Sequence, residues 1–406
     1  MKFLFKLICL FIAAFVLVTV LAGCSSDELT LFNAMLNSES IKTMESKTEI
    51  SMKMEASGLS ESDQEKLEMV LPLLNSSRLV IDQKLSRNED KTVAKSQISA
   101  DISLGGISMN TEIWVDYDIT GSEPKLKEII KLPLIASMGM PEEYKGKEYM
   151  VLDLTQRPEM EGSSMASLKQ MLDMNRILTK EFTEFLKKYA AQLKPGFEVV
   201  KLKERKTVSG KPLQVYELKL DDQTFKALLK HAVNNFIEDK DALSLIEKYL
   251  TSMASMPGFT AEGREDSQAE LEETLADLNA GMPKFKEQFN KIMDALDDVK
   301  IIGDKGVTIR YTIDSQGYIV GETGTLDIEI NKPAIEQAVK SLDPDSYDVA
   351  DSVSSNEVYK FTFDFTTTIS NINKAVDIQL PELNDENSFN MLDMSEAAEP
   401  AYEQGE

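Results

Sequence analysis

The stretch ISADISLGGISMNTEIWV, residues 98–115, alternates apolar and polar side chains on both sides of a glycine pair. Alternation with a period of two predicts β-strands that bury one face and leave the other in water. Two such runs separated by Gly105-Gly106 predict a β-hairpin, and hence an antiparallel sheet. Trp114 is out of phase with Ile113 and Val115, so we expect it on the opposite face, where it either packs internally or contacts a partner.

The same alternation recurs along the chain, in two groups of strands separated by helical segments. We expect strands at 47–56, 79–85, 98–104, 107–115 and 149–154, and again at 197–207, 213–220, 307–313, 318–330, 359–369 and 376–380. Apolar residues at helical spacing predict helices over 27–36 and 165–193 and a helical segment over 222–297. Because strands flank this last segment on both sides, it is either an insertion across one sheet, which we favour, or a boundary between two domains.

The N-terminus has the layout of a secretory signal, with two lysines followed by the apolar run Leu7–Val20. That run of about 14 residues is shorter than the roughly 20 that a membrane-spanning helix needs. It ends in Leu21-Ala22-Gly23-Cys24, which resembles the lipobox of bacterial lipoprotein precursors. The resemblance implies cleavage after Gly23 and a diacylglycerol thioether on Cys24. We therefore expect a signal peptide over 1–23, a lipidated tether over 24–30 and anchoring to the cell membrane on its extracytoplasmic side.

The formal net charge of −25 limits the partners that the chain can have. Nucleic acid is excluded, because its phosphates require clustered Lys and Arg. The same charge disfavours contact between the protein surface and anionic lipid headgroups. We therefore expect the membrane to be reached through the lipidated Cys24. The only other cysteine, Cys9, lies in the signal peptide, so no disulfide is expected.

Few residues of the chain point to catalysis or to metal binding. His231 is the only histidine, and there is no glycine-rich phosphate loop, HExxH motif or GxSxG motif. Four aspartates crowd one loop without the spacing of an EF-hand, namely Asp343, Asp345, Asp348 and Asp351. We predict a protein that is not an enzyme and that holds no cofactor and no metal.

Three features together resemble the LolA-like superfamily of bacterial lipoproteins and lipoprotein carriers. They are a helix followed by an extended segment over 31–54, the turn Asp314-Ser315-Gln316-Gly317 and the ending SNINKAVDIQLP at 370–381. The resemblance implies an α+β fold, with a curved antiparallel sheet that forms an open half-barrel and helices that cover its concave face. This domain would span 31–383 with the helical insertion at 222–297, and an acidic disordered tail would follow at 384–406.

In carrier members of that superfamily the groove holds acyl chains. Two strands here carry side chains suited to line such a groove, since methionine and aromatic residues adapt to irregular apolar ligands. The candidates are Met52, Met54, Tyr359, Phe361, Phe363 and Phe365. We predict an envelope lipoprotein that binds an apolar or lipid ligand. The alternative is a half-barrel with a filled core, whose outer surface binds a protein partner.

Overall fold

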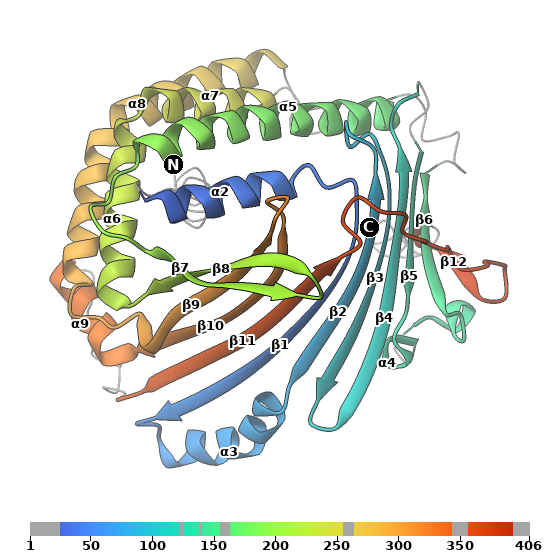
Figure 1. Cartoon of the computed structure of the whole chain (residues 1–406), viewed down its shortest axis with the longest axis horizontal. Helices are drawn as coiled ribbons and strands as arrows, with labels where there is room; N and C mark the ends of the chain where they lie inside the picture. Colours follow the sequence, from blue (N-terminus) through green and yellow to red (C-terminus); the bar gives the residue numbers. More distant parts are fainter. Residues whose placement is uncertain are drawn as a thin grey trace, which may run out of the picture.

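The computed structural model describes residues 25–121, 125–137, 140–154, 163–254, 264–342 and 356–392. The predicted signal peptide, Cys24 and the four clustered aspartates lie outside these residues. The described part has the predicted α+β composition, with one large curved sheet that does not close (Figure 1). None of its helices is both long and apolar enough to cross a bilayer.

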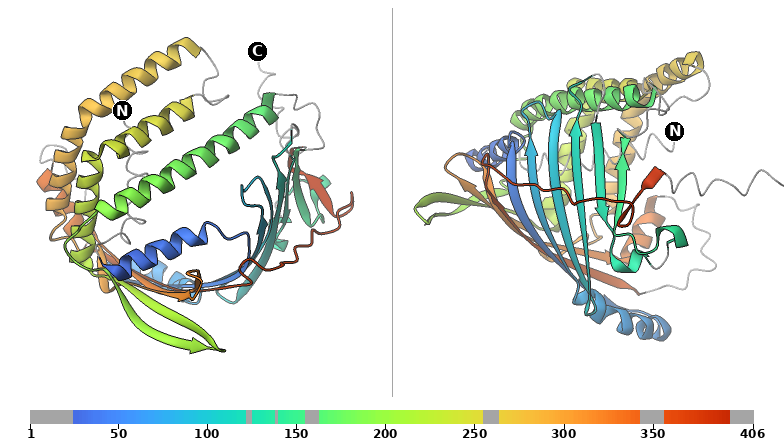
Figure 2. Two further views of the ribbon diagram at one scale, coloured as in Figure 1. Left: turned by 45° about the horizontal axis from the view of Figure 1, so that its top comes forward. Right: turned by 90° about the vertical axis from the view of Figure 1, so that its right-hand side faces the viewer.

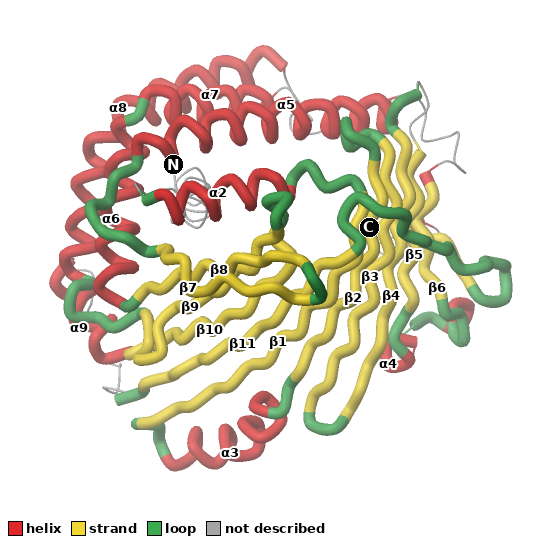
Figure 3. The backbone as a smooth tube through the Cα atoms, viewed as in Figure 1, coloured by secondary structure: helices red, strands yellow, loops and turns green. Residues whose placement is uncertain are grey.

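The sheet contains twelve strands within the described residues, in the order β12-β6-β5-β4-β3-β2-β1-β11-β10-β9-β8-β7 (Figure 3). Neighbouring strands pair antiparallel except β12, which runs parallel to β6, so the sheet is mixed and not purely antiparallel as predicted. The strands are β1 (Thr43–Ser57), β2 (Arg78–Arg87), β3 (Val93–Leu104), β4 (Ile107–Asp118), β5 (Lys125–Lys131), β6 (Tyr149–Asp153), β7 (Val200–Val208), β8 (Lys211–Leu220), β9 (Ile302–Asp314), β10 (Ile319–Asn331), β11 (Val358–Ser370) and β12 (Ser388–Asn390).

Two meanders meet along one seam at the centre of this sheet. Strands β1 to β6 follow one another in chain order on one side, and β7 to β11 do so on the other. The seam is the antiparallel pair of β1 and β11, whose register runs from Glu45 opposite Ser370 to Ser57 opposite Val358. Strands from both sides of the helical segment therefore belong to a single sheet.

Three long helices, α5, α7 and α8, form an arm on the side toward which the sheet curves, and α2 lies between this arm and the sheet (Figures 1 and 2). The helices predicted over 27–36, 165–193 and 222–297 are confirmed, whereas α3, α9 and strand β5 have no counterpart in the predicted pattern. The helices are α2 (Ser26–Ser38), α3 (Glu61–Asn75), α4 (Leu134–Ser137), α5 (Ser163–Gln192), α6 (Asp222–Glu238), α7 (Lys240–Ala254), α8 (Arg264–Ala295) and α9 (Lys332–Leu342).

The main hydrophobic core lies where α2, α5 and α6 pack against the β7–β9 end of the sheet. Phe236 is 1% exposed, and its ring lies edge-on to Phe185 and Tyr189, with centroids 6.2 and 6.3 Å away. Within the described residues, β1 and β11 contribute no side chain to this core. The sheet residues in the core are Val200, Tyr216, Leu218, Leu220, Tyr311, Ile313 and Ile319.

Helix α2 begins almost directly after the predicted lipidation site. Ser25 caps it, accepting a hydrogen bond from the backbone N–H of Glu28, while the Glu28 carboxylate accepts one from the N–H of Ser25. This reciprocal capping satisfies backbone donors that a helix start leaves unpaired. The tether predicted over 24–30 is therefore helical from Ser26 onward.

The predicted strand at 376–380 is wrong, because this segment pairs with no other strand and lies across the outer face of the sheet. Its apolar side chains pack on a small buried cluster around Trp114, which does face away from Ile113 and Val115 as predicted. Trp114 is thus buried by the chain itself, and the partner contact considered for it has no support. The residues that pack there are Ile378, Leu380 and Leu383.

The acidic tail predicted from residue 384 contains ordered structure at its start. Residues 388–390 form β12, and Phe389 is buried against Tyr144, with ring centroids 4.7 Å apart. The strand pairs in parallel with β6, from Ser388 opposite Tyr149 to Asn390 opposite Val151. Residues 393–406 lie outside the described part of the chain.

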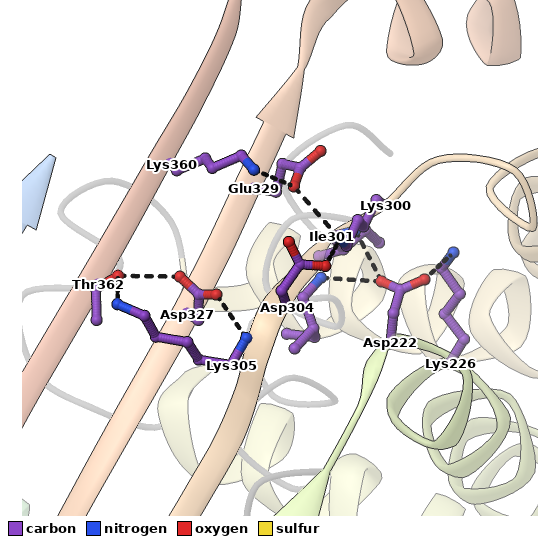
Figure 4. Close-up of polar contacts among 11 residues, drawn as sticks. Asp222, Lys226, Lys300, Ile301, Asp304, Lys305, Asp327, Glu329, Lys360 and Thr362 are labelled. Carbon is purple, nitrogen blue, oxygen red and sulfur yellow. Dashed lines mark hydrogen bonds and ion pairs between the residues drawn. The ribbon is translucent and has the colours of Figure 1, made fainter. Parts of the chain in front are cut away.

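Polar contacts tie the start of α6 to the start of β9 (Figure 4). Oδ1 of Asp222 accepts hydrogen bonds from the backbone N–H groups of Ile301 and Ile302, at 2.8 and 2.9 Å. Its Oδ2 lies 2.6 Å from the buried Nζ of Lys226. Every charge in this pair has a partner, so the contacts hold the helical segment onto the sheet and do not form a vacant polar site.

Asp222→Asn is expected to lower the free energy of unfolding by about 2 kcal/mol at neutral pH, because Lys226 loses its carboxylate. Burial by itself raises the pKa of Asp222, but hydrogen bonds from Lys226, Ile302 and Ile301 outweigh it and bring the pKa below 3.8. Such a group stabilises the fold above its unfolded-state pKa, and the contribution is lost as the pH falls through the folded-state value. Thermal melts should therefore show the difference from the parent closing below about pH 4. The exposed Asp298→Asn serves as the control, and a difference that stays constant with pH would contradict this assignment.

Candidate functional site

The seam between the two meanders brings the six predicted groove residues together. In the register of β1 and β11, Met52 lies opposite Phe363 and Met54 opposite Phe361. Residues directly opposite each other in an antiparallel pair share one face of the sheet. Tyr359 and Phe365 have the same parity on β11, so all six side chains occupy one face: Met52, Met54, Tyr359, Phe361, Phe363 and Phe365.

Apolar side chains extend this face across the neighbouring strands. On β10, Leu326 lies opposite Phe363 and Ile328 opposite Phe361. On the other side, Ile50 of β1 lies opposite Leu79 of β2, and the row continues into β3 and β4. We call this surface the apolar face; besides the six residues it includes Ile50, Leu79, Ile102, Met109, Leu326 and Ile328.

The apolar face is the concave face of the sheet. Phe365 lies opposite Gly324, which continues through Ile309 and Leu218 to Val200 on the same face. Leu218 and Val200 belong to the same core cluster as buried residues of α2 and α6, and α2 lies inside the curve of the sheet (Figure 2).

Burial changes sharply along this face. At the β7–β9 end its side chains belong to the main core, together with residues of α2, α5 and α6. Over β11 and β1 the six candidate side chains are all half-buried. Toward the rim the exposure rises, to 39% for Ile330 and 62% for Ile107. Apolar side chains at the centre of a sheet are usually covered. These six partly buried side chains therefore form a surface that a ligand could bury.

A glycine lets one aromatic ring lie flat on the sheet. A Cβ atom at Gly324 would come within 2.4 Å of Cε1 of Phe365, so any side chain there would collide with the ring. Glycine inside a strand often marks such a close approach. The ring of Phe365 therefore lies over Gly324 of β10 and forms part of the apolar face.

A polar row borders the apolar face on the side nearer α2. Thr48 of β1 and Thr367 of β11 lie opposite each other, with their hydroxyl oxygens 3.0 Å apart. Glu322 of β10 lies between Thr367 and Tyr311 of β9. Burial raises the pKa of Glu322; burial, with the Glu322 charge second, raises that of Tyr311. The concave face thus combines a broad apolar area with hydrogen-bonding groups along one edge, which matches the two parts of an amphiphile.

His231 is half-exposed on α6, where its ring contacts the amide of Asn235 at 3.2 Å and burial lowers its pKa. No carboxylate in the described part is hydrogen-bonded to it. Among those same residues, no group of three or more His, Cys, Asp or Glu side chains is placed to hold a metal ion.

No protein-family model and no curated protein matches this chain. The geometry of the concave face is therefore the basis for assigning a function.

Proposed function

We propose that this chain is a membrane-anchored cell-envelope lipoprotein, without enzymatic activity, that binds an apolar or lipid ligand on the concave face of its half-barrel. The ligand would lie on the apolar face, and the arm of α5, α7 and α8 would cover it. A LolA-like relationship agrees with a curved sheet that has helices on its inner side. The mechanism would be sequestration, in which each buried CH₂ group contributes about 0.8 kcal/mol.

The observation that carries this proposal is that the six seam side chains are only partly buried. An amphiphile could place its acyl chains over Met52 and Phe363 and its polar group near Glu322 and Thr367. The register sets these two regions on one face, two to four residues apart along each strand. A purely structural core would instead bury the aromatic side chains of β11.

The second candidate is an envelope scaffold that binds a protein partner and no ligand. It requires a filled core beneath the helices. The core observed at the β7–β9 end is of that kind, but within the described residues it does not extend to β11. We therefore favour ligand binding.

Native mass spectrometry on the mature lipoprotein, purified gently from a bacterial host, tests the proposal. A lipid held non-covalently adds mass in the native spectrum and is lost in the denatured one, whereas a thioether lipid on Cys24 stays in both. We expect such a native-only mass, extractable as lipid. A protein that carries no non-covalent lipid, and that takes up none when incubated with envelope lipids, would favour the scaffold function.

Phe363→Lys is expected to lower the amount of retained lipid about tenfold or more, because a ligand over this site would have to bury an ammonium group. Thr366→Lys is the matched control, since Thr366 lies three residues further on the same strand, is exposed and faces outward. The lipid bound per protein is read from the native spectra. Equal retention in the two variants would place the ligand elsewhere.

A further inference from the structure

A basic hairpin projects from this otherwise acidic protein. Strands β7 and β8 form it, and residues 201–212 carry five basic side chains and one acid, Glu204. Figure 2 shows the hairpin extending beyond the body of the molecule. We call these five residues the basic hairpin cluster: Lys201, Lys203, Arg205, Lys206 and Lys211.

The outer part of the hairpin, residues 203–212, is accessible to solvent along its whole length. Every residue from 203 to 212 is exposed, on both faces of the two-stranded ribbon. The turn at Ser209-Gly210 has positive φ at both positions, 51° and 77°, as in the tight turns that match the twist of a hairpin. A two-stranded ribbon without a packed face is only marginally stable in water. Contact with a second surface would therefore stabilise it.

Within the described residues, two of the five positive charges in the cluster have no ion-pair partner, and two more are only loosely paired. Lys203 pairs with Glu217 at 2.9 Å, while Lys201 and Lys206 have looser ion pairs of 3.8 and 3.9 Å with neighbouring glutamates. Arg205 and Lys211 form no ion pair within the described part of the chain. The tip of the hairpin therefore presents positive charge to its surroundings.

The base of the hairpin is tied to the start of α2, beside the predicted lipid anchor. Oδ2 of Asp27 accepts a hydrogen bond from the backbone N–H of Leu202 at 2.7 Å, and Oε1 of Glu28 accepts one from Val199 at 2.9 Å. Both acids lie in the first turn of α2, which Ser25 caps. A lipid on Cys24 would thus hold the root of the hairpin at the bilayer surface.

We propose that the basic hairpin cluster binds anionic phospholipid headgroups next to the lipid anchor. This inference rests on the proposed lipidation of Cys24. Each basic side chain close to an anionic bilayer strengthens surface binding about fivefold. The negative net charge of the whole chain does not reveal this local positive cluster. The hairpin gives the anchored protein a second contact, and two contacts fix the orientation of the half-barrel above the membrane where one lipid attachment leaves it free to rotate.

The test places an environment-sensitive fluorophore at the hairpin tip through Val208→Cys. Val208 is 50% exposed, and the mature chain has no other cysteine than Cys24, whose sulfur carries the lipid. The mature lipoprotein is reconstituted in vesicles of phosphatidylcholine, with or without one-third phosphatidylglycerol. We expect a blue shift only in the anionic vesicles, and its loss at high salt.

Charge variants identify the contact. Replacing Arg205, Lys206 and Lys211 by glutamine should lower the ratio of bound to free hairpin about 100-fold, while three exposed lysines replaced elsewhere should leave it unchanged. The control set is Lys53→Gln, Lys284→Gln and Lys374→Gln.

An unchanged emission in anionic vesicles would overturn the proposal, as would a response only to a soluble glycerol-phosphate polymer. The denatured mass of the same sample reports the lipid on Cys24, and its absence would overturn the anchor and this inference together.

Discussion

Phe236→Ala should lower the free energy of unfolding by about 3–5 kcal/mol, whereas Phe363→Ala should lower it by about 1 kcal/mol. The two substitutions remove the same atoms from different surroundings. Phe236 is enclosed by the main core and contacts the rings of Phe185 and Tyr189, so its loss leaves a cavity. Phe363 is only partly buried on the apolar face, so water can occupy the space that its ring leaves.

Urea unfolding of both variants, followed by circular dichroism with the ligand extracted, measures this difference. The comparison bears on function as well as stability. If Phe363→Ala were as costly as Phe236→Ala, the apolar face would be a packed core and the groove would not exist. With ligand present, the difference in the free energy of unfolding between the parent and Phe363→Ala should increase. Ligand binding stabilises the folded state, and the parent should bind the ligand more tightly than the variant.

Cys24→Ala is expected to abolish lipidation and processing completely. The thioether requires the sulfur of Cys24, so the precursor should keep residues 1–23 and incorporate no labelled fatty acid. Cys9→Ala is the matched control, because it removes the other cysteine of the precursor and leaves the lipobox intact. Intact mass and fatty-acid labelling in a bacterial host read out both variants. Normal cleavage of Cys24→Ala would show that the N-terminus is an ordinary secretory signal, and a parent protein that keeps residues 1–23 and takes up no fatty acid would show that it is an uncleaved anchor.

Side-chain alternation predicts most of this sheet because each strand has one covered and one wet face. The hairpin of residues 98–115 is the clearest example, and β3 and β4 pair across Gly105-Gly106 as expected. Strand β5 is not predicted because Ile129 and Ile130 are adjacent and therefore break the alternation. Both faces of the sheet near them carry apolar neighbours. Ile129 packs beneath Trp114, while Ile130 lies opposite Met150 on the concave face.

The segment 376–380 shows the opposite failure. Its residues alternate like a strand because Ile378 and Leu380 pack onto the sheet surface, yet their backbone pairs with no other strand. Alternation reports which side chains are buried and does not reveal whether the backbone joins a ladder. The short β12 escapes for a related reason, since only Phe389 marks it within an acidic stretch.

The aromatic strand at 359–369 indicates an apolar surface, but nothing local in the sequence places it beside Met52 and Met54. That pairing depends on which strand edges remain free once the two meanders have formed. The basic hairpin cluster illustrates a second limit. Its charges are visible in the sequence, whereas its position beside the start of α2 depends on two backbone hydrogen bonds to Asp27 and Glu28.

The seam between β1 and β11 also determines the order in which the molecule can be assembled. Its paired residues Ser57 and Val358 are separated by about three quarters of the chain, and closing a loop of that length costs about 5 kcal/mol of chain entropy. A polypeptide that emerges N-terminus first can form the β1–β6 meander early, but β1 then remains an unpaired edge open to aggregation. The edge is covered only when residues 358–370 arrive. The apolar face is thus completed late in folding, and a chain truncated before residue 358 would lack part of it however well its first half had folded.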